Sequence, residues 1–321
     1  LTPGMPAPIY LKHLAHYFPD EVIDNEFFES IMETSDAWIR ERVGIGERRF
    51  MGDYRGSFPV YDIGRRAVSQ LVETAGVDLG EIDLLISCSS TDDLAYPGPA
   101  NMLSEFFGLK VPAFHMKNGC SSLLFGIQAA RGMLQLGAYR NVLLVCGEPF
   151  TVQADYDERS SSILFGDAAA AAVLSTDAEG LLVEDVALGG QGCISAINST
   201  AAGAAPSRSV YDVHGGAGRS AAFFNEQEPR PGRFHQQGRD VVHFVVDVMP
   251  DEIPAFVHAA GLAGDDIDYF IGHQSNLRML ESLCDKLGFA PERHLTNIER
   301  CGNTASAGWA TVLSEALGDG R

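Results

Sequence analysis

Residues 117–128 read Lys-Asn-Gly-Cys-Ser-Ser-Leu-Leu-Phe-Gly-Ile-Gln, a glycine turn followed by an apolar segment. The run before it, residues 111–116, is short and apolar and predicts a buried strand. After the turn, apolar residues recur at the spacing of one helix face: Leu123, Ile127, Ala130 and Leu134. Cys120 is therefore predicted at the first residue of a helix, where unpaired backbone N–H groups lower the pKa of a thiol and stabilise an oxyanion. A lone cysteine is more often a small buried core residue, so its chemistry needs support from elsewhere in the chain.

The composition of the 321 residues, 45% of them hydrophobic, is that of a globular protein with ample core. No apolar run approaches the ~18 residues that span a membrane, and the first residues do not follow the pattern of a signal peptide. The six cysteines are scattered without a C-x-x-C pair, which argues against a zinc site or a disulfide framework and predicts a reducing cytoplasm. No metal ligand set is predicted.

The net charge of −20 argues against binding nucleic acid through a general basic surface. The same charge repels an acidic partner unless a local basic patch intervenes. One candidate patch combines residues 40–42 with Arg48 and Arg49, and an ordinary solvated run of charges is an equally good interpretation.

Predicted strands alternate with predicted helices along the first half of the chain. Strands are expected at residues 9–17, 82–87, 111–116 and 141–146, with helices at 25–33, 35–42, 61–75 and 100–107 and an alanine-rich apolar stretch up to 174. This alternation predicts a largely parallel sheet covered by helices on both faces. Residues 196–237 are rich in Gly, Ser, Ala and Pro and are interpreted as an irregular, lid-like insertion, and residues 241–260 as a helix.

The second half of the chain repeats features of the first. The segment 260–272 matches 75–87 in helix end, turn and strand, and Gly302-Asn303-Thr304 lies 183 residues after Gly119-Cys120-Ser121. An internal duplication explains both matches and predicts two halves, 1–178 and 179–321, with equivalent turns facing a shared site. By the same comparison, the last strands of the second half are expected to be absent from this sequence.

Duplication places three chemically useful side chains at equivalent strand ends: Cys120 in the first half, and His273 and Asn303 in the second. A thiol nucleophile needs a nearby base or cation, and histidine is the usual one. An asparagine amide together with a histidine N–H can polarise a thioester carbonyl. A single histidine such as His273 is more often a core residue whose hydrogen bonds are satisfied, and a single asparagine such as Asn303 more often forms a turn. The occurrence of all three residues at equivalent positions favours a catalytic site.

Five motifs together resemble the condensing enzymes of the thiolase superfamily, specifically ketoacyl-ACP synthase III. They are Ser35-Asp-Ala-Trp38-Ile-Arg-Glu-Arg42 with Gly44-Ile45, the Cys120 turn, Phe165-Gly-Asp167-Ala-Ala, His273-Gln-Ser-Asn276-Leu-Arg278, and Gly302-Asn303-Thr304-Ala-Ser306. The resemblance covers essentially the whole chain. It implies an α/β, thiolase-like, five-layered αβαβα fold, a homodimer, and a Cys120–His273–Asn303 triad.

The resemblance also implies a reaction without a resident cofactor, whose substrates are acyl-CoA or carrier-protein thioesters. Cys120 is acylated, and His273 and Asn303 bind the carbonyl of a second thioester as it becomes an enolate, usually with loss of CO₂. Further implied contacts are Trp38, Arg42 and Arg159 with coenzyme A, Asn276 with the pantetheine arm, and Arg278 with an acidic carrier protein. Tyr96 matches a position where, in the family, the partner subunit closes the acyl pocket. An aromatic residue of the core explains Tyr96 equally well, and a partly exposed packing residue explains Trp38 equally well.

Departures from the family pattern indicate a different acyl pocket, as in branches that make natural products. The nucleophile turn reads Asn118-Gly-Cys-Ser-Ser122 rather than alanines and glycines, Val43 replaces a common threonine, and Cys301 stands where a ring residue often occurs. The Gly-rich turn that supplies the family's second oxyanion donor belongs to the segment expected to be absent. Alternatives are an acyltransferase of this fold that forms an ester or amide without decarboxylation, and a non-catalytic partner subunit.

Overall fold

The computed structural model describes residues 7–52, 58–94, 96–189, 197–199 and 234–321. Its centre is a six-stranded sheet with the strand order β5-β4-β6-β7-β1-β8. The strands are β1 (Tyr10–Tyr17), β4 (Leu84–Cys88), β5 (Ala113–Met116), β6 (Asn141–Pro149), β7 (Asp167–Ser175) and β8 (Leu181–Leu182). The predicted strand before Cys120 is β5, which is only half buried because it lies at the edge of the sheet.

The sheet is mixed, so the prediction of a largely parallel sheet is wrong. β4 pairs in parallel with β5 and β6, but β7 runs antiparallel to both β6 and β1. The reason lies in residues 150–166, which join β6 to β7 and contain only two helices of four residues each, Phe150–Gln153 and α6 (Arg159–Ser162). Parallel crossovers usually run through a helix that packs across the sheet, and neither of these short helices does so; the chain turns back beside β6 instead.

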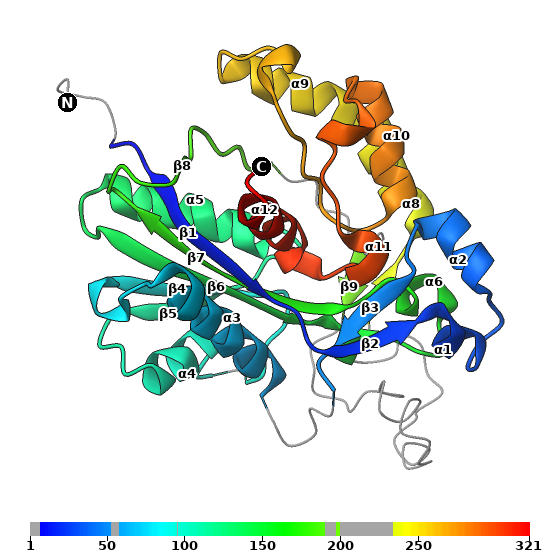
Figure 1. The fold of residues 1–321 in the computed structure, drawn as a ribbon, viewed down its shortest axis with the longest axis horizontal. Helices are drawn as coiled ribbons and strands as arrows, with labels where there is room; N and C mark the ends of the chain where they lie inside the picture. The colour runs from blue at the N-terminus through cyan, green and yellow to red at the C-terminus, as the bar shows by residue number, and fades with distance from the viewer. Residues whose placement is uncertain (1–6, 53–57, 95, 190–196, 200–233) are drawn as a thin grey trace.

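Helices cover both faces of this sheet, as Figure 1 shows. On one face lie α3 (Pro59–Ala75) and α4 (Pro99–Phe106), and on the other α5 (Ser122–Gln135) and α12 (Gly308–Gly318). β7 separates the two cores with short side chains: Ala168, Ala170 and Ala172 face α5 and α12, and Ala169 and Ala171 face α3. The predicted face of α5 is confirmed, since its four apolar residues, Leu123, Ile127, Ala130 and Leu134, are all buried.

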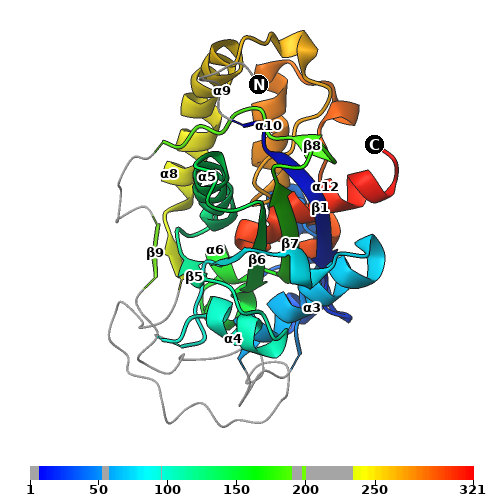
Figure 2. The ribbon, with the colours of Figure 1, turned by 90° about the vertical axis from the view of Figure 1, so that its left-hand side faces the viewer.

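The second half contributes an outer group of helices, seen above α12 in Figure 1 and above α5 in Figure 2. These are α8 (Gly238–His243), a π-helical segment (Phe244–Val248), α9 (Met249–Ala259) and α10 (Leu277–Leu287). The predicted helix at 241–260 is thus confirmed, with a π-helical interruption. Where duplication predicts a strand after residue 266, the described residues form a single bridge between Phe270 and His294.

The remaining elements are short. They are β2 (Glu21–Asp24), α1 (Asn25–Glu29), α2 (Asp36–Val43), β3 (Glu47–Phe50), β9 (Ile197–Ser199), β10 (Phe234–Gln236), α11 (Ile298–Cys301) and the one-turn helices Leu79–Glu81, Gly264–Asp266, Pro291–Arg293 and Ala305–Ala307. Most of the insertion predicted at 196–237 lies outside the described residues. Within them, no helix is both long and apolar enough to cross a membrane.

Two equivalent turns from the two halves meet at the end of the sheet. Gly119 and Gly302 both adopt positive φ angles, 56° and 66°, and each precedes a residue of the predicted triad. At Gly302 a Cβ atom would also lie 2.8 Å from the Leu164 carbonyl oxygen, so glycine is required there. The backbone N–H of Leu123 donates to Ser306 Oγ at 3.0 Å and joins the two turns directly.

Candidate active site

A cavity of about 830 Å³ opens where these turns meet. Its wall contains Ser90, the turn 117–121, Leu124, Phe150 and Gln153 from the first half, and Phe234, Phe244, Ile271, His273 and Trp309 from the second. The structure therefore brings Cys120 and His273 to one cavity although 153 positions of sequence separate them. The wall is mostly apolar with a few polar groups, which is typical of a small-molecule site.

Cys120 lies before helix α5 and not at its first residue. The helix begins at Ser122 with Ser121 as its N-cap. Its first free N–H groups are also occupied, because Ser121 N donates to the Asn118 carbonyl oxygen, Ser122 N to the Gly119 carbonyl oxygen, and Leu123 N to Ser306 Oγ. The expected stabilisation of a thiolate by these groups is therefore lost.

The predicted lowering of the Cys120 pKa is accordingly wrong. Burial raises the pKa of this thiol to about 12, and the nearby Glu148 carboxyl adds to the rise, while only the residue's own backbone N–H acts against it. Burial dominates because a low-dielectric wall disfavours the charged sulfur. At neutral pH Cys120 is a thiol.

His273 is held as a neutral imidazole on a rigid loop. Burial lowers its pKa to about 4, and its Nδ1 has no hydrogen-bond partner among the described residues. The neighbouring Gln274 fixes the loop: its amide donates to the Gly272 carbonyl oxygen at 2.8 Å and accepts from Thr296 Oγ at 2.6 Å. A Cβ at Gly272 would lie 2.5 Å from Leu280 Cδ2, so a larger residue there would displace that side chain. A nitrogen of the ring is thus available to a ligand.

Asn303 is 5% exposed and, unlike Cys120 and His273, does not itself line the cavity. Its backbone pairs with the strand-like segment before β7, donating to the Leu164 carbonyl oxygen at 2.7 Å and accepting from Gly166 N at 3.1 Å. Between those residues, Phe165 packs on two residues of the wall, Phe150 and Phe234, with ring centroids 4.4 and 5.0 Å away. The side-chain oxygen of Asn303 accepts from Ala305 N at 2.9 Å, which leaves the amide NH₂ as the donor that can serve a ligand.

Arg48 supports the segment that holds Asn303, and sequence reasoning missed this role. The side chain is wholly buried, and its Nε donates to the Ile163 carbonyl oxygen at 2.8 Å while Nη1 donates to Asn25 Oδ1 at 2.5 Å. Burial lowers its pKa to about 9. Arg48 therefore does not belong to the candidate basic patch, because it lies in the core, whereas Arg40 and Arg42 are exposed.

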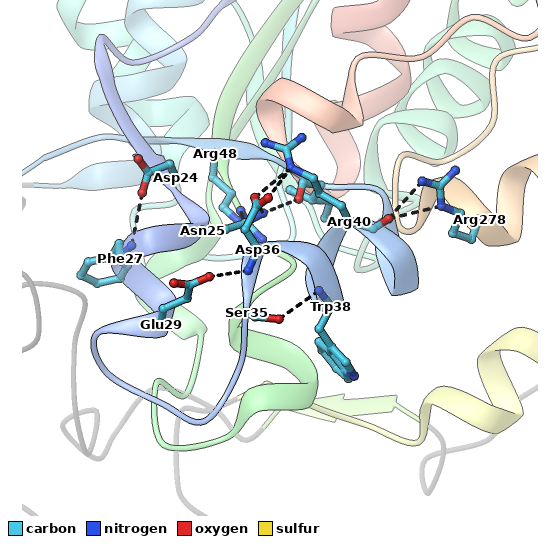
Figure 3. A network of polar contacts seen from close by, with 11 residues as sticks. Asp24, Asn25, Phe27, Glu29, Ser35, Asp36, Trp38, Arg40, Arg48 and Arg278 are labelled. Carbon is cyan, nitrogen blue, oxygen red and sulfur yellow. Dashed lines mark hydrogen bonds and ion pairs between the residues drawn. The ribbon is translucent and has the colours of Figure 1, made fainter.

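Trp38 and Arg159, two predicted coenzyme A contacts, lie against each other. The Arg159 guanidinium carbon is 4.6 Å from the Trp38 ring centroid, and Arg159 also donates to the Glu33 carbonyl oxygen at 2.7 Å. The backbone of Trp38 is fixed by the N-cap Ser35, whose hydroxyl accepts from Trp38 N at 3.2 Å (Figure 3). The indole is partly exposed on the surface of α2.

Asn276 and Arg278, the predicted contacts of the pantetheine arm and of the carrier protein, connect α10 to α2. Asn276 caps α10 by accepting from Met279 N, and its amide lies 3.4 Å from the Arg42 carbonyl oxygen. Arg278 donates through Nε and Nη2 to the Arg40 carbonyl oxygen at 3.3 and 3.1 Å (Figure 3). These bonds bring the His273 loop and the Trp38 helix together. The Arg42 side chain is exposed.

Tyr96 is 87% exposed, which rules out the alternative of a core aromatic. It lies just before Pro97 and α4. At the cavity wall Lys117 Nζ lies 2.8 Å from Asp92, whose other oxygen is 2.7 Å from His115 Nε2. Hydrogen bonding to His115, supported by Lys117, lowers the Asp92 pKa to about 2.

Glu148 is a second buried ionisable residue next to the cavity that the sequence analysis did not single out. It is wholly buried near the end of β6 and binds Ser90 of the cavity wall. A carboxylate inside the otherwise apolar run 141–149 was a signal that could have identified it.

The described part of the chain contains no group of three or more His, Cys, Asp or Glu side chains placed to hold a metal ion.

Comparisons with known proteins agree with this arrangement. Residues 114–192 match the family described as 3-oxoacyl-[acyl-carrier-protein] synthase III, and residues 257–321 match its C-terminal region. β-Ketoacyl-[acyl-carrier-protein] synthase III of Staphylococcus saprophyticus is 32% identical over 97% of this chain and 90% of its own length. A Bacillus subtilis relative with the same name and the number 2 is 31% identical over 95% of this chain and 88% of its own.

A solved structure shows the same fold. The crystal structure of the Thermus thermophilus synthase III superposes with a TM-score of 0.84 at 29% identity, over 97% of this chain and 91% of that one. The predicted α/β, thiolase-like fold is thereby confirmed.

Proposed function

Because the chain belongs to the β-ketoacyl-[acyl-carrier-protein] synthase III family, we propose that it loads an acyl group onto Cys120 and joins this group to a second thioester through a new carbon–carbon bond. One observation carries the proposal: Cys120 and His273 share a cavity, and the Asn303 turn lies against its wall. The product is a β-ketoacyl thioester, of the kind used in fatty-acid or polyketide-type biosynthesis.

Acylation begins from a neutral pair. Cys120 is a thiol and His273 an uncharged imidazole, since their pKa values of about 12 and 4 lie on either side of neutrality. The sulfur attacks the carbonyl carbon of an acyl thioester as its proton passes to the imidazole. The tetrahedral intermediate then expels the carrier thiolate, which takes the proton and leaves as a thiol.

Condensation uses two hydrogen-bond donors that act on the second thioester. An N–H of the neutral His273 ring and the Asn303 amide NH₂ bind the carbonyl oxygen of the second thioester and stabilise the enolate that forms as CO₂ leaves a malonyl unit. The enolate carbon attacks the carbonyl of acyl-Cys120. The C–S bond breaks, and the sulfur recovers a proton. No resident cofactor or metal takes part in this scheme.

We assign the binding of coenzyme A and of the carrier protein to the surface around α2. Trp38 with Arg159, Arg42 and Asn276 would contact coenzyme A or the pantetheine arm, and the location of Arg278 on the same side suits an acidic carrier protein, despite a net charge of −20. We assign the exposed Tyr96 to the interface of a homodimer in which it closes the partner's acyl pocket. The scattered cysteines support a cytoplasmic location.

The proposal is tested by intact-protein mass spectrometry with a panel of acyl-CoA thioesters followed by malonyl-CoA or malonyl carrier protein. One acyl increment on the Cys120 peptide is expected, and its loss upon adding the malonyl thioester should coincide with a β-ketoacyl product. An ester or amide product without a new carbon–carbon bond would identify a simple acyltransferase. Absence of any acyl increment across the panel would indicate a non-catalytic subunit.

Replacement of Trp38 by alanine is expected to raise KM for acyl-CoA about 5- to 30-fold with little change in kcat, because a stacking and cation–π surface contributes ~1–2 kcal/mol. Steady-state kinetics measure the effect. A thioester of N-acetylcysteamine lacks the nucleotide and should show no change between Trp38→Ala and the parent enzyme. An equal loss with both substrates would assign Trp38 to packing.

A further inference from the structure

Glu148 is a buried carboxyl group behind the cavity that the proposed reaction does not use. It is wholly inaccessible to solvent, near the end of β6. Its Oε1 accepts from the backbone N–H of Ser90 at 2.7 Å and from the Ser90 hydroxyl at 2.9 Å, and Ser90 itself lines the cavity. Its Oε2 is buried and makes no hydrogen bond of good geometry with the described residues, and the backbone N–H of Ser306 favours the charged form only weakly. An ionised carboxylate so poorly compensated is strongly disfavoured at such a place.

The titratable groups around Glu148 are thiols. Cys146, on the same strand, lies with its sulfur 3.7 Å from Oε1. Cys88 on β4 and Cys120 on the turn before α5 both feel the charge of Glu148, which raises the pKa of each. None of the ion pairs within the described ranges includes Glu148, so no cation there compensates a negative charge.

Ser306 connects this group to both catalytic turns. Its hydroxyl lies 3.2 Å from Cys146 Sγ and accepts from Leu123 N in the first turn of α5. Ser306 itself lies three positions after Asn303. The environment of Glu148 is therefore continuous with the Cys120 turn and rigidly packed against it.

We infer that Glu148 is a positioning residue for Cys120: as an uncharged carboxylic acid it leaves the sulfur free to take up negative charge, and as a carboxylate it opposes that charge. The inference rests on the proposed role of Cys120 as the nucleophile and adds a control on its reactivity. Burial raises the pKa of Glu148 to about 8, while the donors of Ser90 act more weakly in the opposite direction. The acid form therefore prevails at neutral pH, and the carboxylate forms only in mild alkali.

The test is the pH dependence of Cys120 alkylation by iodoacetamide, followed by mass spectrometry of the Cys120 peptide. In the parent enzyme the rate should rise about tenfold per pH unit up to about pH 8 and then flatten, because each Glu148 that ionises suppresses a thiolate. Glu148→Gln keeps the shape and the Ser90 bonds but cannot ionise, so its rate should continue to rise. At pH 9.5 the variant is expected to react about tenfold faster than the parent.

Two further variants separate charge from structure. Glu148→Asp keeps an ionisable group and should retain the flattening. Ser90→Ala removes a donor to Oε1, so the pKa of Glu148 should rise and the flattening should begin at higher pH. Thermal unfolding checks that each variant folds. Parallel profiles for the parent and Glu148→Gln would overturn the inference. Alkylation needs no substrate, so this outcome is distinct from a failure of acyl loading, which would reject the proposed function instead.

Discussion

Replacing Cys120 by alanine is expected to abolish acyl loading and to lower turnover about 10⁴-fold or more, since the variant has no atom to carry the acyl group. Intact-protein mass spectrometry after incubation with acyl-CoA should show no increment, and product formation should fall to background. Because Cys120 sits in a turn whose backbone bonds come from its neighbours, the variant should fold normally.

The matched control is Cys301→Ala. Cys301 lies close to Asn303 but is fully buried, and burial raises its pKa to about 12. It is expected to leave acyl loading intact. An acyl increment that persists in Cys120→Ala and disappears in Cys301→Ala would place the nucleophile on the wrong turn and refute the proposed mechanism.

Replacing Asn303 by alanine is expected to separate the two half-reactions. Acylation of Cys120 should change by less than about fivefold, whereas condensation should slow about 10²- to 10³-fold, the usual effect of losing one donor to a developing oxyanion. Single-turnover experiments, in which pre-acylated enzyme meets the malonyl thioester, measure the second step alone.

Asn303→Asp serves as the matched variant. It keeps an oxygen that can accept from Ala305 N, so the turn is preserved, but it replaces the NH₂ donor. It should condense as poorly as the alanine variant. His273→Ala, in contrast, should slow both steps. If Asn303→Ala slowed acylation as much as condensation, the amide would be supporting the turn and not the enolate.

Much of the site could be predicted because its signals are local and repeated. Periodicity located α5, and the match between Gly119-Cys120 and Gly302-Asn303 placed two distant turns at equivalent strand ends. The same duplication placed His273 at an equivalent position, and the family resemblance then added the Trp38 helix. The roles of these residues are still to be measured, but the structure brings Cys120 and His273 to one cavity.

What the sequence did not reveal depends on environment. The antiparallel direction of β7 follows a connection, residues 150–166, that contains only two four-residue helices and no crossover helix, and no local pattern in that segment predicts this. The pKa of Cys120 depends on burial and on Glu148, which comes close only after β6 is in place. Arg48 looks like its exposed neighbours until the fold encloses it. In each case a long-range contact outweighs the local pattern.

The pairing of the two glycine turns also limits how such a site can arise. If a single half formed a symmetric pair with a copy of itself, both turns would carry the same residue, because symmetry makes the two positions identical. Such an ancestor could present two sulfurs or two amides, but never one of each. The division of labour between Cys120 and Asn303 therefore requires two copies that are free to differ in sequence, as the two halves of one chain are.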